Sequence, residues 1–298
     1  MLVSGDDEYR SEESLPMLAK LLSEKHGFDC VVLFAINPDT QTVDPNYQSN
    51  IPGLHHLDDA DAMIMCTRFR SLPDWQMAHF EKFFKAGKPF TALRTSTHPF
   101  NFAPSSNSSY KSWSFNSQEW PGGFGQQIIG ETWHSHHGNH GSQATRGVIA
   151  DAGKNSKILN GVSDVFGPSD VYGVVHLPST ANVLMLGQVL SGMKPTDPPL
   201  EGEKNNPMMP LVWTKDYQMV EGKGGKLFCT TMGAATDFLN EDLRRLVVNA
   251  TYWMCGLEDL IPSKADVGVS EKYKPSNFGF KDAKFFPELR IRPIDLIP

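Results

Sequence analysis

Residues 61–93 have the sequence DAMIMCTRFRSLPDWQMAHFEKFFKAGKPFTAL. The apolar runs 61–67 and 89–93 have the length of buried strands. Between them, residues 73–87 begin with Pro-Asp, carry aromatic and methionine side chains at helical spacing, and end at a glycine of the kind that terminates helices. A strand, a helix and a second apolar strand in this order predict a parallel sheet with right-handed crossovers.

The segments around this unit continue the alternation of helix and strand. Leucines at helical spacing behind an acidic first turn predict a helix over 11–26, and an apolar stripe behind Asn240 predicts another over 239–254. Residues 1–6 have the pattern of the end of a first strand. Further apolar runs predict strands at 29–36, 147–149, 183–186, 209–214 and 226–231.

These elements predict a single α/β domain over residues 1–257. Two stretches interrupt the pattern, at 98–125 and 188–208, and we expect both to be long loop insertions. Residues 258–298 are rich in proline, lysine and phenylalanine, and we expect them to form a tail that wraps the domain.

The charge balance limits the kind of partner. The 298 residues include 27 Lys and Arg against 34 Asp and Glu, which gives a formal charge of −7. A broad surface for nucleic acid or for a membrane is therefore not expected, and the partner should be a small molecule. No stretch reaches the roughly 18 apolar residues of a membrane helix, so we expect a soluble protein. The sequence has no glycine-rich phosphate loop, and we expect no nucleotide cofactor.

The first residues and the cysteines give information on the cellular location of the protein. Residues 1–6 look like a strand whose beginning is missing, so we expect a trimmed precursor, and a cytoplasmic and an exported location both stay open. Cys30, Cys66, Cys229 and Cys255 lie far apart in apolar runs. They predict buried, unpaired thiols.

The strongest local signal is a run of histidines in the sequence GETWHSHHGNHG, residues 130–141. Four of the ten histidines of the chain lie in this histidine run: His134, His136, His137 and His140. In an extended or turning backbone they can converge on Zn²⁺ or another divalent metal, because neutral imidazole is a common ligand of such ions. Two alternatives stay open, namely binding of sugar-like hydroxyls and a purely structural role. The metallo-hydrolase motifs that the spacing suggests also place an aspartate where this chain has Gly138.

Polar residues follow the two predicted strands at 61–67 and 89–93. Ligands of parallel sheets collect at the carboxyl ends of strands, so we expect these residues to bind substrate. They are Arg68 and Arg70 after the first strand, and Arg94, Thr95 and Ser96 after the second. No glycine flanks the two hydroxyl residues, which argues against a nucleophile elbow. The alternatives are that the hydroxyls cap a turn and that the arginines form surface ion pairs.

A third candidate is the turn GPSDVY at residues 167–172. Asp170 can orient a histidine or act as a general base, and Tyr172 can bind substrate. An aspartate in this position is also a common turn residue.

Six segments that span nearly the whole chain share their pattern with a known family. They are residues 3–11, 67–70, 93–98, 130–141, 167–173 and 230–237. Through them the chain resembles the trehalose utilisation (ThuA-like) family, most closely its planctomycete-type branch. The resemblance implies a class I glutamine amidotransferase-like fold, which is a flavodoxin-like three-layer α/β/α sandwich with a mostly parallel sheet. It also implies a role in carbohydrate metabolism, on keto-sugars or disaccharides made by partner dehydrogenases.

The resemblance extends to single residues. His98, His134 and His136 match histidines that the family keeps near its pocket. The amidotransferase relatives carry a cysteine nucleophile after the strand that matches 89–93, where this chain has Arg-Thr-Ser at 94–96. We therefore expect no glutaminase activity.

Our leading hypothesis is an enzyme that acts on a sugar or keto-sugar by hydrolase-like or isomerase- or lyase-like chemistry, in a pocket at the carboxyl edge of the sheet. The residues expected to move protons or to orient those that do are His98, His134, His136, Glu131 and Asp170. The residues expected to bind substrate are Arg68, Arg70, Arg94, Thr95, Ser96 and Tyr172. The alternative is a non-catalytic sugar-binding or interaction protein that has lost the nucleophile, and Trp and Tyr side chains between 110 and 120 are candidates for stacking on sugar rings.

The tail carries an apolar group of four phenylalanines. Phe278, Phe280, Phe285 and Phe286 either pack on the core of their own chain or on a second subunit. A homo-oligomer is therefore one expectation.

Overall fold

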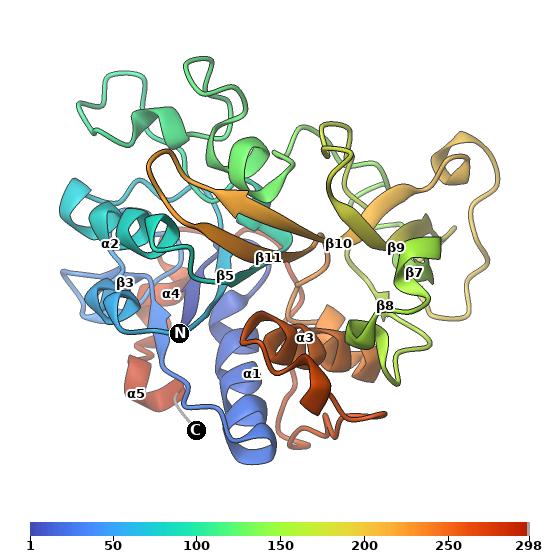
Figure 1. The fold of residues 1–298 in the computed structure, drawn as a ribbon. Helices are drawn as coiled ribbons and strands as arrows, with labels where there is room; N and C mark the ends of the chain where they lie inside the picture. The colour runs from blue at the N-terminus through green and yellow to red at the C-terminus, as the bar shows by residue number, and fades with distance from the viewer. Residues whose placement is uncertain (297–298) are drawn as a thin grey trace.

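The computed structural model describes residues 1–296, and its centre is one sheet of nine strands in the order β2-β1-β5-β6-β11-β10-β9-β7-β8 (Figure 1). Five neighbouring strands pair in parallel: β2 (Val32–Phe34), β1 (Leu2–Gly5), β5 (Met63–Thr67), β6 (Phe90–Leu93) and β11 (Gly224–Thr230). The remaining strands pair antiparallel: β10 (Met209–Gln218), β9 (Asn182–Val189), β7 (Thr145–Ile149) and β8 (Phe166–Gly167). A separate hairpin consists of β3 (Ile36–Asn37) and β4 (Thr42–Val43).

The sheet is mixed, so the prediction of a mostly parallel sheet is wrong. From β11 outward every pairing is antiparallel, and β9 and β10 are long strands of 8 and 10 residues. The connections explain the difference. Residues 219–223 join β10 to β11, and so short a link makes a hairpin, whereas a parallel pair needs a crossover of about a dozen residues or more. The predicted strand–helix–strand unit is confirmed as β5, α2 and β6.

Helices cover both faces of the parallel half of the sheet (Figure 1). On one face, α1 (Ser11–His26) and α3 (Glu241–Met254) share an apolar cluster with the sheet, in which Leu22, Leu246 and Phe228 take part. On the other face, α2 (Asp74–Lys85) packs through Phe80 and Phe84. The three helices lie where the periodicity of the sequence predicts them.

The loop 98–125 completes the layer that α2 forms. Phe100, Trp113 and Phe124 are buried, and the ring of Phe124 lies 4.7 Å from that of Phe84 and 5.2 Å from that of Trp113, measured between centroids. Tyr110 is also buried and donates its hydroxyl hydrogen to Glu81 at 2.6 Å. This corrects the expectation that the aromatic side chains of the loop stack on sugar, because Tyr110 and Trp113 belong to the core.

The C-terminal segment returns to the N-terminal part of the chain. It contains α4 (Phe285–Leu289) and α5 (Pro293–Leu296), which Figure 1 shows in red beside the blue N-terminal elements. The guanidinium of Arg10 lies over the rings of Phe285 and Phe286, at 5.8 and 5.1 Å from their centroids. These two phenylalanines therefore pack on their own chain.

All four cysteines are free, and the two in the sheet, Cys66 and Cys229, are buried, whereas Cys30 and Cys255 are half-buried. Within residues 1–296, no helix combines the length and the apolar character that a bilayer crossing requires.

The parallel strands bring several polar segments to one edge. The carboxyl ends of β1, β5, β6 and β11 lie side by side because these strands run in the same direction. The residues that follow them are Asp6 to Glu8, Arg68, Arg94 and Thr231. We call this part of the molecule the carboxyl edge.

Candidate functional site

A fully buried ion pair between Arg94 and Asp170 lies at the carboxyl edge. Arg94 begins the turn after β6 with a φ of 45°, and its Nη2 lies 2.9 Å from Oδ1 of Asp170. Its Nη1 donates to the backbone carbonyls of Asp170 and Thr231, at 2.7 and 2.8 Å. The rings of Tyr9 and Tyr172 lie 4.3 and 4.1 Å from the guanidinium carbon, within the range of cation–π contacts. Arg94 therefore holds the Asp170 turn against the sheet.

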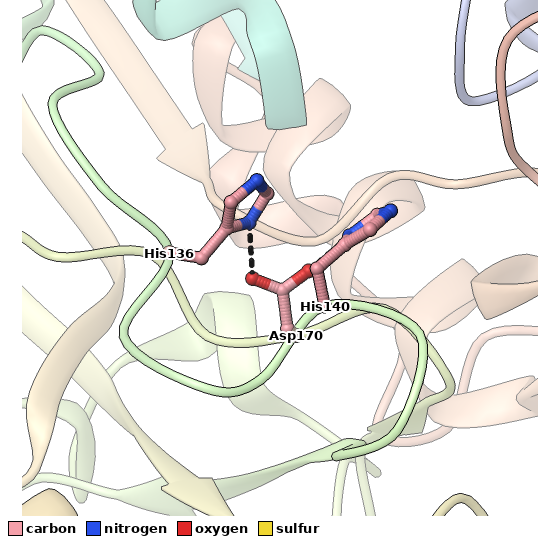
Figure 2. A group of neighbouring side chains, drawn as sticks. All are labelled: His136, His140 and Asp170. Carbon is pink, nitrogen blue, oxygen red and sulfur yellow. Dashed lines mark hydrogen bonds and ion pairs between the residues drawn. The ribbon is translucent and has the colours of Figure 1, made fainter.

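Asp170 also binds two histidines of the histidine run (Figure 2). Nδ1 of His136 lies 2.7 Å from Oδ2, and Nδ1 of His140 lies 2.9 Å from Oδ1. An ionised carboxylate only accepts hydrogen bonds, so both rings donate through Nδ1–H. In Figure 2 the second nitrogen of each ring points away from the carboxylate. The run is fixed in this position because two of its backbone N–H groups donate to the carbonyl of Val171, at 2.8 and 3.0 Å.

The charges around Asp170 keep it ionised. Burial alone would raise the pKa of Asp170, but Arg94 and the hydrogen bonds from His136 and His140 outweigh burial and hold this pKa well below its usual value. The hydrogen bond to Asp170 raises the pKa of His140 in turn; burial opposes this rise, and the negative charges of Asp170 and Glu8 add to it. One atom each of His136, His140 and Asp170 lie within 4.8 Å of one another, so this group could hold a metal ion.

The two imidazoles line a cavity of about 350 Å³, near the lower end of the range of about 300–1,000 Å³ for small-molecule sites. We call it the carboxyl-edge cavity. Its other lining residues are Glu8, Arg68, His98, Trp133, Tyr172, Gly279 and Phe280. Aromatic rings and ionisable groups in one small space suit a ligand with both apolar and polar faces.

Glu8 is an acid of this cavity that the sequence analysis did not select. Its side chain is 8% exposed, with Oε1 3.4 Å from Nε2 of His140 and Oε2 3.5 Å from Nε of Arg68. Burial raises the pKa of Glu8, and the negative charge of Asp6 raises it further against the opposing effect of nearby cations. A carboxyl group with a raised pKa beside an imidazole can exchange protons with a ligand. The sequence signal that could have selected Glu8 is the row of three acids at 6–8, directly after an apolar strand.

His98 forms a neutral wall of the cavity. The residue is 2% exposed, its Nδ1 lies 3.1 Å from the hydroxyl of Thr97, and its ring centroid lies 5.0 Å from that of Phe69 and 5.6 Å from that of Trp133. Burial lowers the pKa of His98 well below its usual value, and the charges of Arg68 and a second arginine act in the same direction. Its imidazole is therefore uncharged near neutral pH.

Five of the site residues predicted from the sequence line the cavity, and a sixth, Asp170, is hydrogen-bonded to two of these, His136 and His140. The five are Arg68, His98, His136, His140 and Tyr172. The sequence alone therefore selected most of the ionisable groups that the fold brings together.

Three further residues expected to bind substrate, Arg70, Thr95 and Ser96, make hydrogen bonds to other groups of the protein and do not line the cavity. Arg94 does the same. Arg70 is buried and donates to three backbone carbonyls. Thr95 donates to the carboxylate of Asp6, and Ser96 donates to the carbonyl of Met65 at 2.9 Å. The alternative in which the hydroxyls support the turn agrees with these contacts.

Glu131 and two histidines of the run lie away from the cavity. Glu131 accepts hydrogen bonds from Nδ1 and from the backbone N–H of His176, both at 2.7 Å. The ring of His134 lies 5.9 Å from that of His176, and Nε2 of His137 lies 2.7 Å from the carbonyl of Lys204. The structure thus corrects the expected set of four metal-binding histidines. Only the other two of the run come together, and their third partner is a carboxylate.

A larger hollow of about 840 Å³ lies at the opposite, amino ends of β1 and β5. Its walls are largely apolar and include Phe28, Met63 and Met254. We place the candidate site in the smaller cavity, because the buried ion pair, the paired imidazoles and Glu8 all meet there.

Comparisons with known proteins agree on one family. A family model for trehalose utilisation (ThuA) matches residues 3–254. Among solved structures, a protein described as ThuA-like from Parabacteroides merdae ATCC 43184 aligns with a TM-score of 0.54 at 13% identity, over 94% of this chain and 96% of that one. Another, from Bacteroides uniformis ATCC 8492, aligns with a TM-score of 0.49 at 14% identity, over 85% and 89%. No curated protein matches the sequence.

The structure from Parabacteroides merdae shows a shared fold only, because its identity to this chain is low. The match to the family model shows more than a shared fold. It starts within β1 and includes the other strands of the carboxyl edge and the histidine run. It ends before the C-terminal tail.

Proposed function

The chain belongs to the trehalose utilisation (ThuA) family, and from this premise we propose that it is an enzyme that moves protons on a sugar or keto-sugar in the carboxyl-edge cavity. The family gives the chain a carbohydrate-related role. The observation that carries the proposal is that one buried carboxylate, Asp170, holds Nδ1 of both His136 and His140 while both rings line the cavity.

This arrangement suits proton transfer. A ring that donates Nδ1–H to a carboxylate offers a lone pair at Nε2 when neutral, and the carboxylate stabilises the imidazolium that forms when Nε2 takes a proton. His136 and His140 share this environment, so one can accept a proton while the other donates one. Glu8 lies 3.4 Å from Nε2 of His140 and can resupply it.

A keto-sugar offers such chemistry at the carbon next to its carbonyl. We propose that His136 takes the proton from this carbon, that the electron pair of the C–H bond moves toward the carbonyl, and that the carbonyl oxygen receives a proton from His140. Return of a proton to the former carbonyl carbon, with loss of the hydroxyl proton from the neighbouring carbon, completes an isomerisation. Departure of an oxygen substituent from the next carbon, with a proton, completes an elimination instead. Neither route needs an oxidant or a reductant.

The other walls of the cavity would position the sugar. Trp133 offers an aromatic face, on which the apolar face of a sugar ring stacks well. Neutral His98 and charged Arg68 can hydrogen-bond to hydroxyl or carbonyl oxygens.

A metal-assisted form of the reaction is the second candidate. His136, His140 and Asp170 could hold Zn²⁺ or another divalent ion, which when bound would polarise a carbonyl oxygen. Elemental analysis of protein purified without chelators separates the two forms, since the absence of bound metal excludes this one.

A non-catalytic sugar-binding protein is the third candidate, and the aromatic and charged walls of the cavity are compatible with it. Product analysis distinguishes it from an enzyme, because this candidate binds sugar without converting it.

We also propose that the parallel half of the sheet corresponds to a flavodoxin-like core. Numbered along the chain, its five strands follow the order 2-1-3-4-5, which is the order of that type of doubly wound sheet. The antiparallel strands β7 to β10 would then be an addition to this core.

The proposal is tested with His136→Ala and His140→Ala, assayed on trehalose and on trehalose oxidised to the ketone on one ring. General acid–base catalysis contributes about 10²- to 10⁴-fold, so each variant should lose turnover by about this factor. His55→Ala is the control, because His55 is exposed and lies in a short helical turn whose next residue, His56, lines the hollow at the amino ends of the strands. Unchanged turnover of both sugars by the two cavity variants would contradict the proposal.

A further inference from the structure

The C-terminal tail, which lies outside the family match, forms part of the candidate site. The family model ends at residue 254, yet Gly279 and Phe280 line the carboxyl-edge cavity together with the imidazoles. A segment about 25 residues past the family match therefore supplies one wall of the cavity.

Several hydrogen bonds fix this segment against the end of β1 and the start of α1. The N–H of Gly279 donates to the carbonyl of Glu8 at 2.8 Å, and Arg10 donates to the carbonyl of Gly279 at 2.6 Å. A little earlier, the N–H of Ser276 donates to the carboxylate of Glu13 at 2.7 Å. The backbone on both sides of Gly279 is thus tied to the residues that carry Glu8.

The two phenylalanines beside Gly279 have different surroundings. The ring of Phe278 lies 5.4 Å from that of Tyr9 and 5.2 Å from that of His140, so it packs behind the site. Phe280 is 60% exposed and lines the cavity. The guanidinium of Arg68 lies 4.7 Å from its ring centroid, so a cation–π contact orients an aromatic ring that is otherwise open.

We propose that Phe280 is a substrate-binding residue that stacks on the apolar face of a sugar ring in the carboxyl-edge cavity. The inference rests on the proposed function and adds to it a residue of the tail. An exposed apolar ring needs no explanation by itself. This ring, however, lines a cavity that contains ionisable groups, and its cation–π contact with Arg68 favours one orientation, which lowers the conformational cost of binding a ligand.

The test is sugar binding and turnover by Phe280→Ala, with trehalose and mono-keto trehalose as the probes. An aromatic contact contributes about 1 kcal/mol beyond simple burial, so the Kd and the KM should rise about five- to tenfold while kcat stays near the wild-type value. Phe280→Tyr keeps the aromatic face and should restore binding, whereas Phe280→Leu keeps apolar volume alone and should not. Leu260→Ala is the matched control, because Leu260 is an equally exposed residue of the same tail that does not line the cavity.

A second variant changes the position of the ring without removing it. Gly279 has a φ of 127°, and a Cβ added there would meet no atom within 4 Å. Gly279→Ala therefore strains the backbone without a clash, since side-chain-bearing residues rarely adopt this conformation. The KM should rise as it does in Phe280→Ala, and the melting temperature should fall by only a few degrees, because strain of about 1–3 kcal/mol is small for a chain of this length.

The outcomes separate this inference from the proposed function. If Phe280→Ala and Gly279→Ala bind and convert the probes like the wild type while His136→Ala is inactive, the inference is wrong and the proposed function stands. The inference is also wrong if Phe280→Leu binds as well as Phe280→Tyr. If the wild-type protein neither binds nor converts either probe, both fail.

Discussion

The side chain of Asp170 has no access to solvent, yet its two oxygens accept hydrogen bonds from Arg94, His136 and His140. Each of these groups comes from a different part of the chain or a different turn of the histidine run. Their positions depend on one another, because a buried guanidinium needs a counter-charge and the imidazoles need a partner for Nδ1–H. At the scale of the residue, the site is therefore a set of groups organised by a single carboxylate.

Asp170→Asn should lower both stability and activity. The amide keeps the shape of the side chain but removes the charge, so Arg94 stays buried without its counter-ion, a change that costs about 3–5 kcal/mol in comparable cases. The imidazoles also lose the acceptor that orients them, and turnover should fall with stability. Urea unfolding followed by circular dichroism measures the first effect. A variant that is as stable and as active as the wild type would show that Asp170 does not organise the site.

Glu12 gives a pH dependence that is independent of the cavity. Burial raises its pKa from an ordinary value of 4.5 to about 7, although Arg10, 3.3 Å away, opposes this effect. A folded pKa above the unfolded one means that the contribution of Glu12 to stability is complete below about pH 4.5 and is lost as the pH rises through 7.

The measurement compares Glu12→Gln with the wild type by urea unfolding between pH 5 and pH 8.5. The amide does not ionise, so the free energy of unfolding of the variant should gain about 2 kcal/mol relative to the wild type across this range. Asp6 and Glu13 face the same carboxyl group and act in the same direction as burial. A difference that stays constant with pH would mean that Glu12 is ionised throughout.

At the scale of the element, the loop 98–125 behaves as part of the layer that α2 forms. Trp113 is 7% exposed and packs among Phe84, Phe100 and Phe124. The composition of the loop suggested a sugar-binding surface, because Trp and Tyr side chains can either fill a core or stack on a sugar ring. Only the packing of the fold separates a ring that is buried from one that faces a ligand.

Trp113→Ala should therefore affect stability and leave sugar binding unchanged. Removal of a large buried aromatic side chain costs about 3–5 kcal/mol, which should appear as a lower melting temperature in calorimetry. Trp75→Ala is the matched control, because Trp75 on α2 is 65% exposed and surface substitutions usually change stability by less than about 0.5 kcal/mol. Normal stability together with weaker sugar binding would instead place Trp113 in the binding surface.

The parallel half of the sheet could be predicted from the sequence, whereas the antiparallel half could not. The helices α1, α2 and α3 and the strands β5 and β6 follow directly from periodicity, from Gly87 after α2 and from Asn240 before α3. The apolar runs at β10 and β11 were also found, but an apolar run carries no information on the direction of pairing. The strands predicted at 209–214 and 226–231 leave eleven residues between them, which does not decide the direction. In the structure both strands are longer, and the five residues 219–223 that remain are too few for a crossover.

At the scale of the whole molecule, the candidate site combines segments that lie far apart in the sequence. Glu8 follows β1, His136 and His140 come from a loop in the middle of the chain, and Phe280 comes from the tail. The sequence predicted the histidines because their spacing is unusual. It did not predict Glu8 or Phe280, since neither an acid after a strand nor a phenylalanine in a tail indicates a site until the fold places both beside an imidazole.

The most direct test of the proposed function is proton exchange on the sugar itself. Mono-keto trehalose is incubated with the protein in D₂O, and the carbon next to the carbonyl is followed by NMR. The proposed role of His136 and His140 predicts deuterium at this carbon or conversion of the sugar with the wild-type protein and with His55→Ala, and neither with His136→Ala or His140→Ala. Wild-type protein that binds the sugar but leaves it unexchanged and unconverted would contradict proton transfer and favour a binding protein.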